Sequence, residues 1–344
     1  MNWASHQKTY NNVLECIGYT PMINLNRISE DLNAKICIKL EYCNPSGSLK
    51  DRVAKRIVEK AEERGELKPG MILLEGTTGN TGIATAMVGA AKGYRVIIVM
   101  PEGMSEERKK TIAAYGAELV LTEGAETDVD LVLEKVEAIK NQYKDQVFEI
   151  GQFYRTENLD AHMSGTAPEI WEQTEGKVDA FIMCQGTGGT VTGTAKYLKS
   201  RNPNIKVYIS EPAESPILSY KRIGQHKVQG VADGLIPEIL DLQYIDGIIL
   251  VSSDESIAMA RTVAQKEGIF CGISSGLNVA AAVKLAKKYP ELKCICTVVN
   301  DNGLRYLSTE LCGTKPVRRL LERDYSLSQE DQEKLNQYQL EIIE

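Results

Sequence analysis

Four segments of this sequence combine residue types that could do chemistry, and the first centres on a lysine. Lys50 follows a run of turn-forming residues at 44–48 and stands where a helix is predicted to begin. The positive end of a helix lowers the pKa of a lysine amine, so Lys50 could act as a nucleophile or form a Schiff base. A solvent-exposed lysine in a first helical turn is the alternative, and the segment taken alone favours it.

Two loops rich in small polar residues follow strand-like segments and could each hold an anion. The first, before an alanine-rich helix, offers hydroxyls, an amide and free backbone N–H groups, which suit a carboxylate. Its members are Thr77, Thr78, Gly79, Asn80 and Thr81. A capping turn is the alternative, although the run is longer than a cap needs.

The second loop stands at a predicted helix N-terminus and suits a single phosphate held by N–H groups, hydroxyls and the helix dipole. Its members are Gly186, Thr187, Gly188, Gly189 and Thr190. It lacks the acidic partner of a dinucleotide fingerprint and the Gly-Lys-Ser/Thr of a P-loop. A tight turn without a ligand is the alternative.

The remaining candidates are weaker when taken alone. Ser274 lies in a Gly-Ile-Ser-Ser-Gly segment before another alanine-rich helix, where a serine cap is common. Cys294 and Cys296 alternate in a strand-like run, which puts both on one face of a buried strand. Core packing is favoured over a metal or redox pair, and since the three histidines show no ligand spacing, no metal site is expected.

The segments that must position these residues alternate between strand and helix. A strand, a short loop and a helix in repeated order predict an α/β fold with parallel sheets and helices on both faces, where ligands bind beyond the carboxyl ends of strands. The predicted strands are 34–40, 71–75, 95–100, 118–121, 180–184, 206–210 and 293–299. The predicted helices are 51–64, 83–92, 105–115, 129–142, 253–267, 274–288 and one from the phosphate-type loop to residue 200.

The composition argues against nucleic-acid-binding, membrane-spanning and secreted proteins. The 344 residues include 40 Lys and Arg against 47 Asp and Glu, a net charge of −7, which argues against a nucleic-acid binder. No apolar run is long enough to span a membrane, and the first residues lack a secretory h-region, so a cytoplasmic protein is expected. Eight scattered cysteines in a chain of this length do not indicate a disulfide framework.

The four segments in this order resemble the cysteine synthase/cystathionine β-synthase family, the fold-type II pyridoxal-phosphate (PLP) enzymes. The resemblance covers roughly residues 13 to 310. Further matching segments are Ile17-Gly18-Tyr19-Thr20-Pro21, Lys39-Leu40-Glu41, Ser105-Glu106-Glu107-Arg108, Tyr115-Gly116-Ala117-Glu118-Leu119, Gln152-Phe153, Pro168-Glu169-Ile170-Trp171 and Arg305-Tyr306-Leu307-Ser308.

The resemblance implies a role for each matching position. Lys50 would hold PLP as the internal aldimine and move protons at Cα, and Ser274 would hydrogen-bond the pyridine nitrogen. Asn80 would contact the 3′ oxygen of the cofactor. The loop at 186–190 would bind the phosphate, while Thr77, Thr78, Gly79, Thr81 and Gln152 would bind the substrate carboxylate.

The resemblance also implies a reaction and an organisation. A leaving group departs from Cβ of a small L-amino acid through an α-aminoacrylate, and a nucleophile then adds: β-replacement in cysteine and sulfide metabolism. Two doubly wound, mostly parallel sheets are implied, with residues 51–150 as a smaller mobile domain and 1–50 plus 151–319 as the larger PLP-binding domain. Residues 320–344 would form a helical tail, and the enzyme would be a homodimer.

One departure from the family pattern bears on the reaction. Asp233 stands where cysteine synthases usually have a small apolar residue, near the β-substituent of the substrate. It could take a proton from water or a thiol, so that the enzyme would accept L-cysteine and release sulfide; a solvated turn residue is the alternative. An ordinary O-acetylserine sulfhydrylase, a cystathionine β-synthase and a catalytically impaired regulatory homologue stay open. Gly76 and Gly151 also depart from the usual pattern.

Overall fold

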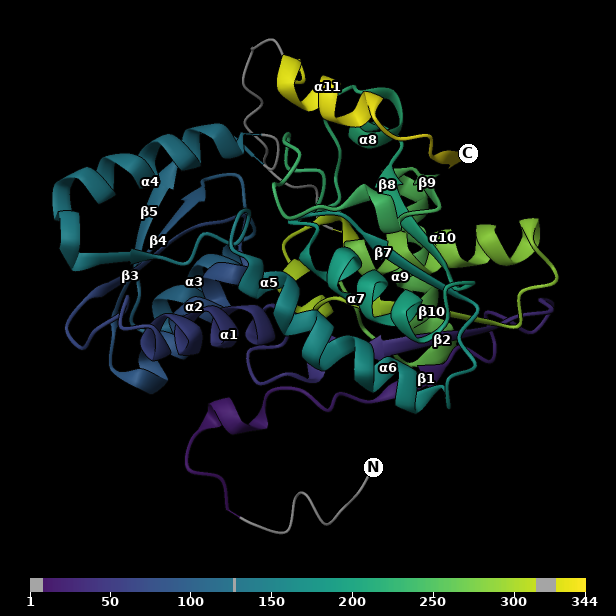
Figure 1. Ribbon diagram of the computed structural model, residues 1–344, viewed down its shortest axis with the longest axis horizontal. Helices are drawn as coiled ribbons and strands as arrows, with labels where there is room; N and C mark the ends of the chain where they lie inside the picture. The colour runs from purple at the N-terminus through teal and green to yellow at the C-terminus, as the bar shows by residue number, and fades with distance from the viewer. Residues whose placement is uncertain (1–8, 126–127, 314–325) are drawn as a thin grey trace.

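The computed structural model describes residues 9–125, 128–313 and 326–344 of the chain. Their strands form one seven-stranded and one four-stranded sheet. Figure 1 shows the smaller sheet with α1 to α4 on the left and the larger sheet with α7, α9 and α10 on the right. Helices surround both sheets, as the alternating sequence pattern predicts.

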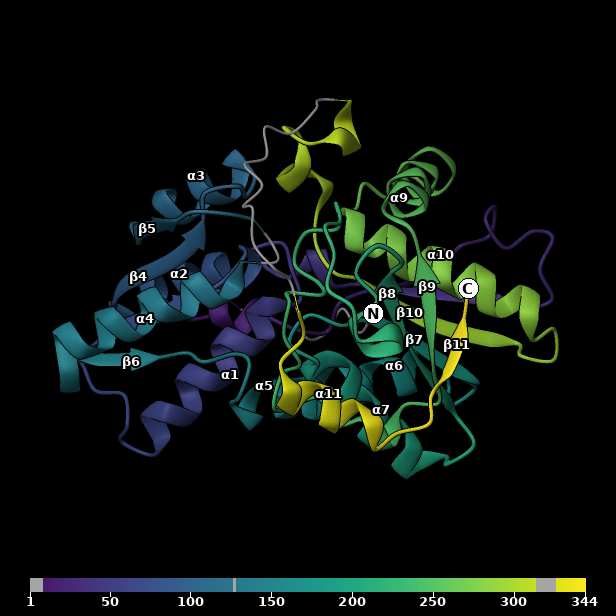
Figure 2. The same cartoon turned by 90° about the horizontal axis from the view of Figure 1, so that it is seen from above.

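The larger sheet has the strand order β1-β2-β10-β7-β8-β9-β11. Only β1 runs antiparallel to its neighbour, and the other pairs are parallel. The strands are β1 (Met22–Asn24), β2 (Lys35–Leu40), β7 (Ala180–Cys184), β8 (Lys206–Pro212), β9 (Gly247–Val251), β10 (Cys294–Val299) and β11 (Glu341–Ile343). Figure 2 shows α9 (Ser253–Glu267) and α10 (Ile273–Lys288) on one side of this sheet and α6 (Ala167–Gln173) and α7 (Gly189–Arg201) on the other.

The smaller sheet is parallel throughout, in the order β5-β4-β3-β6. Its strands are β3 (Ile72–Gly76), β4 (Arg95–Pro101), β5 (Glu118–Thr122) and β6 (Val147–Glu149). Leu73 packs with α1 (Lys50–Glu63) and α2 (Asn80–Lys92), while its neighbours Ile72 and Leu74 pack with α4 (Val129–Tyr143) on the opposite face. The two-residue alternation of a strand thus explains why both faces carry helices.

Three helices begin earlier than the sequence pattern predicts. The helix α1 includes Lys50, α2 begins at Asn80 rather than Ile83, and α10 begins at Ile273. The difference is one residue for α1 and α10 and three for α2, whose first residues Asn80-Thr81-Gly82 are small and polar, so that its apolar periodicity starts only at Ile83. The consequence for the site is that Asn80 and Thr81 are helical residues and not loop residues.

The C-terminal part differs from the helical tail that the sequence predicts. Residues 320–325 lie outside the described residues, and α11 (Gln329–Asn336) is a helix as expected. After it, β11 pairs in parallel with β9 and extends the larger sheet, as Figure 2 shows. Three residues are too few for periodicity to reveal such an edge strand.

The other described α-helices are α3 (Glu106–Ala114), α5 (Thr156–Ala161) and α8 (Ile217–Tyr220). None of the helices in the described part of the chain is both long enough and apolar enough to cross a membrane.

Candidate active site

The carboxyl ends of strands from both sheets meet at two adjoining pockets, and these collect most of the residues that the sequence analysis selected. Both pockets are lined by Lys50, Asn80, Thr187 and Gly230. The first also contains Gly186, Gly188, Thr190, Gln229, Ser274 and Asn300. The second contains Thr77, Thr78, Thr81, Arg108, Gln152, Phe153 and Asp233. Segments more than 200 residues apart in sequence therefore share one cavity.

Lys50 is the first residue of α1 and reaches the shared part of the cavity. Burial lowers the pKa of its amine, and the negative charge of Asp233 opposes that shift. Within the described residues its Nζ forms no ion pair or hydrogen bond. A desolvated lysine without a fixed partner is suited to react with a carbonyl group.

The loop between β7 and α7 presents donors to the first pocket. In the described part of the chain, the backbone N–H groups of Thr187 and Gly188 donate to no protein atom, and α7 directs its positive end at them. Asn158 supports the loop, since its Nδ2 donates to Thr187 Oγ1 over 2.9 Å. The site therefore matches a phosphate dianion, which backbone donors and a helix dipole can bind without a cationic side chain.

The loop can pack closely on Asn158 because Gly189 has no side chain. A Cβ atom at position 189 would lie 2.1 Å from Asn158 Oδ1. Beside it, Thr190 Oγ1 lies 3.1 Å from His162 Nε2. Burial lowers the pKa of His162 to about 3, so this imidazole stays neutral and adds no charge to the loop.

Ser274 lies in the first turn of α10 and lines the same pocket. Its Oγ accepts a hydrogen bond of 3.0 Å from Asn300 Nδ2, so its own proton can be given to an acceptor in the pocket. Cys184 also accepts from Asn300, and burial raises the pKa of this thiol to about 12. The Asn300 amide therefore links the Ser274 hydroxyl to an uncharged thiol.

The loop between β3 and α2 faces the second pocket with side chains. Thr81 Oγ1 donates to Gln152 Oε1 over 2.5 Å, and Gln152 Nε2 donates to Gly76 O over 3.5 Å, which leaves the second hydrogen of Nε2 for a ligand. Thr77 Oγ1 accepts from the Gly79 N–H. Gly79 has φ +148°, and a Cβ there would lie 2.1 Å from Arg108 Cδ, so only glycine lets the arginine pass.

Asn80 has protein partners for both ends of its amide. Its Nδ2 donates to Asp301 Oδ2 over 2.7 Å, and its Oδ1 accepts from Arg305 Nη1. Asp301 Oδ2 also accepts from the Tyr306 hydroxyl. The second hydrogen of Asn80 Nδ2 is the one that a ligand in the pocket could use.

The sequence analysis missed Arg108 as a site residue, although it quoted the segment 105–108. This side chain is 1% exposed, lies over the Tyr306 ring at 4.6 Å from the centroid, and donates to Gln229 Oε1. It thereby joins α3, beside the smaller sheet, to loops of the larger one. The signal available in the sequence was an arginine in the first turn of a helix, where a positive charge opposes the dipole.

Asp233 lies in the wall of the second pocket and is 5% exposed. The interpretation of this residue as a solvated turn residue is therefore wrong. The backbone on either side turns sharply, with Ala232 at φ +51° and Gly234 at φ +85°, and the Ala232 N–H donates to Gln185 O. A positive φ at an alanine is sterically unfavourable. The loop adopts this strained conformation, and Asp233 lies inside the pocket as a result.

A second carboxyl group lies under the threonine loop. Glu75, on β3, is buried and accepts from the Gly151 N–H over 2.9 Å. Burial, with Glu149 nearby, raises the pKa of Glu75 to about 8, so this carboxyl is neutral at pH 7. An uncharged Glu75 does not repel an anion held by the loop above it.

Comparison with known proteins identifies the family. The family model of pyridoxal-phosphate dependent enzymes matches residues 13–301. A cysteine synthase of Staphylococcus aureus is 45% identical over 306 residues, which are 89% of this chain and 98% of that protein. The chain belongs to the cysteine synthase family of PLP-dependent enzymes.

Solved structures agree with this assignment. A hydrogen sulfide-producing enzyme from Fusobacterium nucleatum superposes with a TM-score of 0.84 at 41% identity, covering 87% of this chain and all of that one. The cysteine synthase of Entamoeba histolytica gives a TM-score of 0.85 at 40% identity, with 97% of both chains covered. The two-sheet architecture is thus that of a fold-type II PLP enzyme, as the sequence predicts.

The residues of the cavity fit PLP. The unpaired loop N–H groups suit its phosphate, the Ser274 proton suits its ring nitrogen, and the Lys50 amine suits its aldehyde. The loop, Ser274 and Lys50 all line one pocket, so a single small molecule could contact all three.

Proposed function

We propose that this enzyme carries out β-replacement on a small L-amino acid, with L-cysteine as donor, release of sulfide, and addition of water or a thiol at Cβ. The observation that carries the choice of reaction is the burial of Asp233 in the same pocket as Lys50 and the threonine loop. The F. nucleatum relative is described as hydrogen sulfide-producing, which supports sulfide release.

The threonine loop would orient the substrate. The Thr77 and Thr78 hydroxyls and the Gln152 amide offer donors to the α-carboxylate. Thr81 orients the Gln152 amide through its hydroxyl, and the Gly79 N–H, which donates to Thr77 Oγ1, orients the Thr77 hydroxyl. PLP, when bound, supplies an aldehyde for the amino group of the substrate and a ring that withdraws electrons from Cα. Because Ser274 is neutral, it holds the ring nitrogen without charging it.

Two side chains would move the protons. Lys50 takes the proton from Cα as the Cβ–S bond breaks and the electron pair leaves with sulfur as hydrosulfide. Asp233 then takes the proton of the incoming water or thiol as its oxygen or sulfur bonds to Cβ, and Lys50 returns a proton to Cα. The balance is cysteine plus water to serine plus H₂S, or cysteine plus a thiol to a thioether plus H₂S.

An ordinary cysteine synthase, using O-acetylserine and sulfide, is the second candidate, supported by the name of the S. aureus relative. A product assay distinguishes the two. L-cysteine, O-acetylserine and L-serine are supplied separately, with and without sulfide or homocysteine, and the amino acid formed is identified. Sulfide release from L-cysteine as the fastest reaction supports our proposal, whereas activity confined to O-acetylserine plus sulfide contradicts it.

Asp233→Asn keeps the shape of the side chain and removes its basicity. The first release of sulfide should survive, since Lys50 performs that step, whereas addition should slow by about 10²–10⁴-fold. Rapid quenching should show a burst of one sulfide per site followed by slow turnover. Asp254→Asn, at an exposed ion pair with Lys227, is the matched control. If Asp233→Asn showed wild-type turnover and the same products, Asp233 would have only a structural role and our proposal would be contradicted.

Three further expectations stay proposals: residues 51–150 close over the bound carboxylate, the enzyme is a homodimer, and it acts in the cytoplasm. Arg108 and Gln229 supply a contact across the junction that closure would tighten. Sedimentation at micromolar concentration should give the mass of two chains, and a single-chain mass would exclude the dimer.

A further inference from the structure

A cluster of three thiols lies in the larger sheet, outside the active site. The strands β2 and β10 pair in parallel, with Cys37 directly opposite Cys296. Cys294 is two residues before Cys296 and therefore on the same face. Cys37 and Cys294 have their Sγ atoms 3.7 Å apart, and Cys294 and Cys296 have theirs 3.9 Å apart. All three Sγ atoms lie within 4.8 Å of one another.

These separations match the edges of a metal–thiolate polyhedron. With a metal–sulfur distance of about 2.3 Å, a tetrahedral site has sulfur–sulfur edges of about 3.8 Å, and a planar triangle has edges of about 4.0 Å. A disulfide would need about 2.05 Å between two sulfurs, and none of the three cysteines is in one. The cluster is thus spaced for an ion between the sulfurs and not for a bond between two of them.

A surface pocket leads to the cluster. Cys37 and Cys294 contribute to its lining, together with Asn24, Lys35, Lys177 and Lys293. Asn24 Oδ1 lies 3.1 Å from Cys37 Sγ and brings an oxygen donor to the edge of the cluster. Three thiolates around a monovalent or divalent ion carry net negative charge. Lys35 and Lys293 offset part of it, whereas Lys177 is paired with Glu175 of the same pocket.

A bound ion would displace the protons of the three thiols, because the thiolate is the form of cysteine that binds metals.

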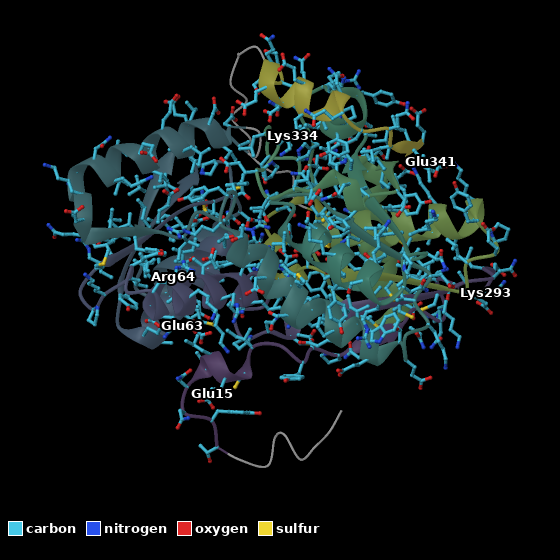
Figure 3. The ribbon with its side chains drawn as sticks, in the orientation of Figure 1. Glu15, Glu63, Arg64, Lys293, Lys334 and Glu341 are labelled. Carbon is cyan, nitrogen blue, oxygen red and sulfur yellow. The ribbon has the colours of Figure 1, made fainter. Side chains whose placement is uncertain are left out.

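The cluster is separate from the catalytic cavity. Cys294 and Cys296 lie at the start of β10, whereas Asn300, which follows its end, lines the PLP pocket. Asn300 is four positions after Cys296, which is about 13 Å along an extended chain. Figure 3 shows Lys293, the residue before β10, at the outer edge of the larger unit, away from the junction of the two sheets.

We propose that Cys37, Cys294 and Cys296 form a binding site for one thiophilic d¹⁰ cation, Zn²⁺ or Cu⁺, which enters through this pocket. Soft thiolate ligands select these ions over hard cations. The sequence analysis expected no metal site and did not connect Cys37 with Cys294. These residues are 257 positions apart in sequence, and only strand pairing brings them together.

The test is a titration of the reduced, PLP-loaded enzyme with Zn²⁺ or with Cu⁺, without oxygen, against a chromophoric chelator. One equivalent of either ion should bind, three of the eight thiols should lose reactivity, and X-ray absorption should show three sulfurs at about 2.3 Å. Binding of both ions, or of Cu⁺ alone, supports the site. Binding of neither, or a first shell of oxygen and nitrogen, overturns it.

Single substitutions assign the ligands. Loss of an outer partner of a metal ligand costs 10–100-fold in affinity, so Cys37→Ala, Cys294→Ala and Cys296→Ala should each weaken binding by at least about 100-fold. Cys16→Ala and Cys312→Ala, at exposed cysteines, are the controls and should bind as wild type. Cys294 is only half-buried, so this variant should fold, and unchanged PLP absorbance verifies it. Undiminished binding in a folded Cys294→Ala would refute the assignment.

Discussion

The two anion-binding loops of this enzyme resemble each other in sequence and differ in what surrounds them. Both follow a buried strand, are rich in glycine and threonine, and open a helix. The loop at 186–190 presents unpaired backbone N–H groups, backed by Asn158 and a neutral His162. The loop at 77–81 presents side-chain donors completed by Gln152, with Arg108 packed behind Gly79.

The difference shows how similar local sequences come to suit different anions. Backbone donors at a helix start cannot be removed by substituting a side chain, which suits a cofactor that stays bound. Side-chain donors can adjust when the substrate enters and leaves, and the protonated Glu75 beneath them does not repel the substrate. The comparison predicts that substitutions in one loop affect the cofactor and substitutions in the other affect the substrate.

Lys50 lies between the loops and should matter to both. Lys50→Ala removes the amine that binds the aldehyde and carries the Cα proton, so kcat should fall by at least about 10⁴-fold. Steady-state assays give the rate, and absorbance shows whether PLP is still held by the phosphate loop alone. A variant with near-normal turnover would mean that the two loops do not serve a common centre.

Gln152→Ala should affect the substrate and spare the cofactor. A hydrogen bond to a charged group contributes about 1.5–3 kcal/mol, so kcat/KM should fall by about 10- to 150-fold, as it should in Thr77→Ala. PLP affinity, measured by equilibrium dialysis, should hardly change. If PLP affinity fell together with activity, the assignment of one loop to the substrate and the other to the cofactor would be wrong.

Gly189→Ala should affect the cofactor first. The added Cβ would lie 2.1 Å from Asn158 Oδ1, and overpacking of this kind costs about 1–3 kcal/mol, so PLP should bind about 5- to 150-fold more weakly. With saturating PLP, KM for the amino acid should return close to the wild-type value. Ser200→Ala, at the other end of the same helix, is the control. A raised KM at saturating PLP would contradict the comparison.

Glu75 gives the smallest effect, on the pH dependence of stability. Its folded pKa of about 8 lies above its ordinary value, so the folded state binds more protons than the unfolded state between about pH 4.5 and 8. The stability contributed by this carboxyl is complete below pH 4.5 and is lost as pH rises through 8. Because glutamine does not ionise, Glu75→Gln should not show this loss of stability with rising pH.

Denaturant unfolding at pH 6 and pH 9 tests this expectation. Glu75→Gln should gain stability relative to wild type by roughly 1 kcal/mol or more between the two pH values. Glu63→Gln, at an exposed carboxylate, should follow the wild-type curve. Parallel curves for Glu75→Gln and wild type would show that Glu75 is already ionised beneath the threonine loop.

Most of the fold could be predicted from local pattern. The long parallel strands and their helices were found because buried parallel strands read as apolar runs and their covering helices are periodic over several turns. The edge strands β1, β6 and β11 are three residues long and were missed, as was β9, although its run Gly-Ile-Ile-Leu-Val is apolar throughout. The start of α2 was placed three residues late, because Asn80, Thr81 and Gly82 carry no apolar signal.

The sequence by itself determined the chemistry available: a lysine at a helix start, two glycine- and threonine-rich loops and a serine before a helix, in an order that resembles a known family. Only the tertiary structure decided which groups face each other. It placed Asp233 inside the pocket, Arg108 across the junction of the sheets, and Cys37 beside Cys294 and Cys296. Local pattern follows from backbone geometry, whereas these contacts depend on strand pairing and sheet packing between residues up to 257 positions apart.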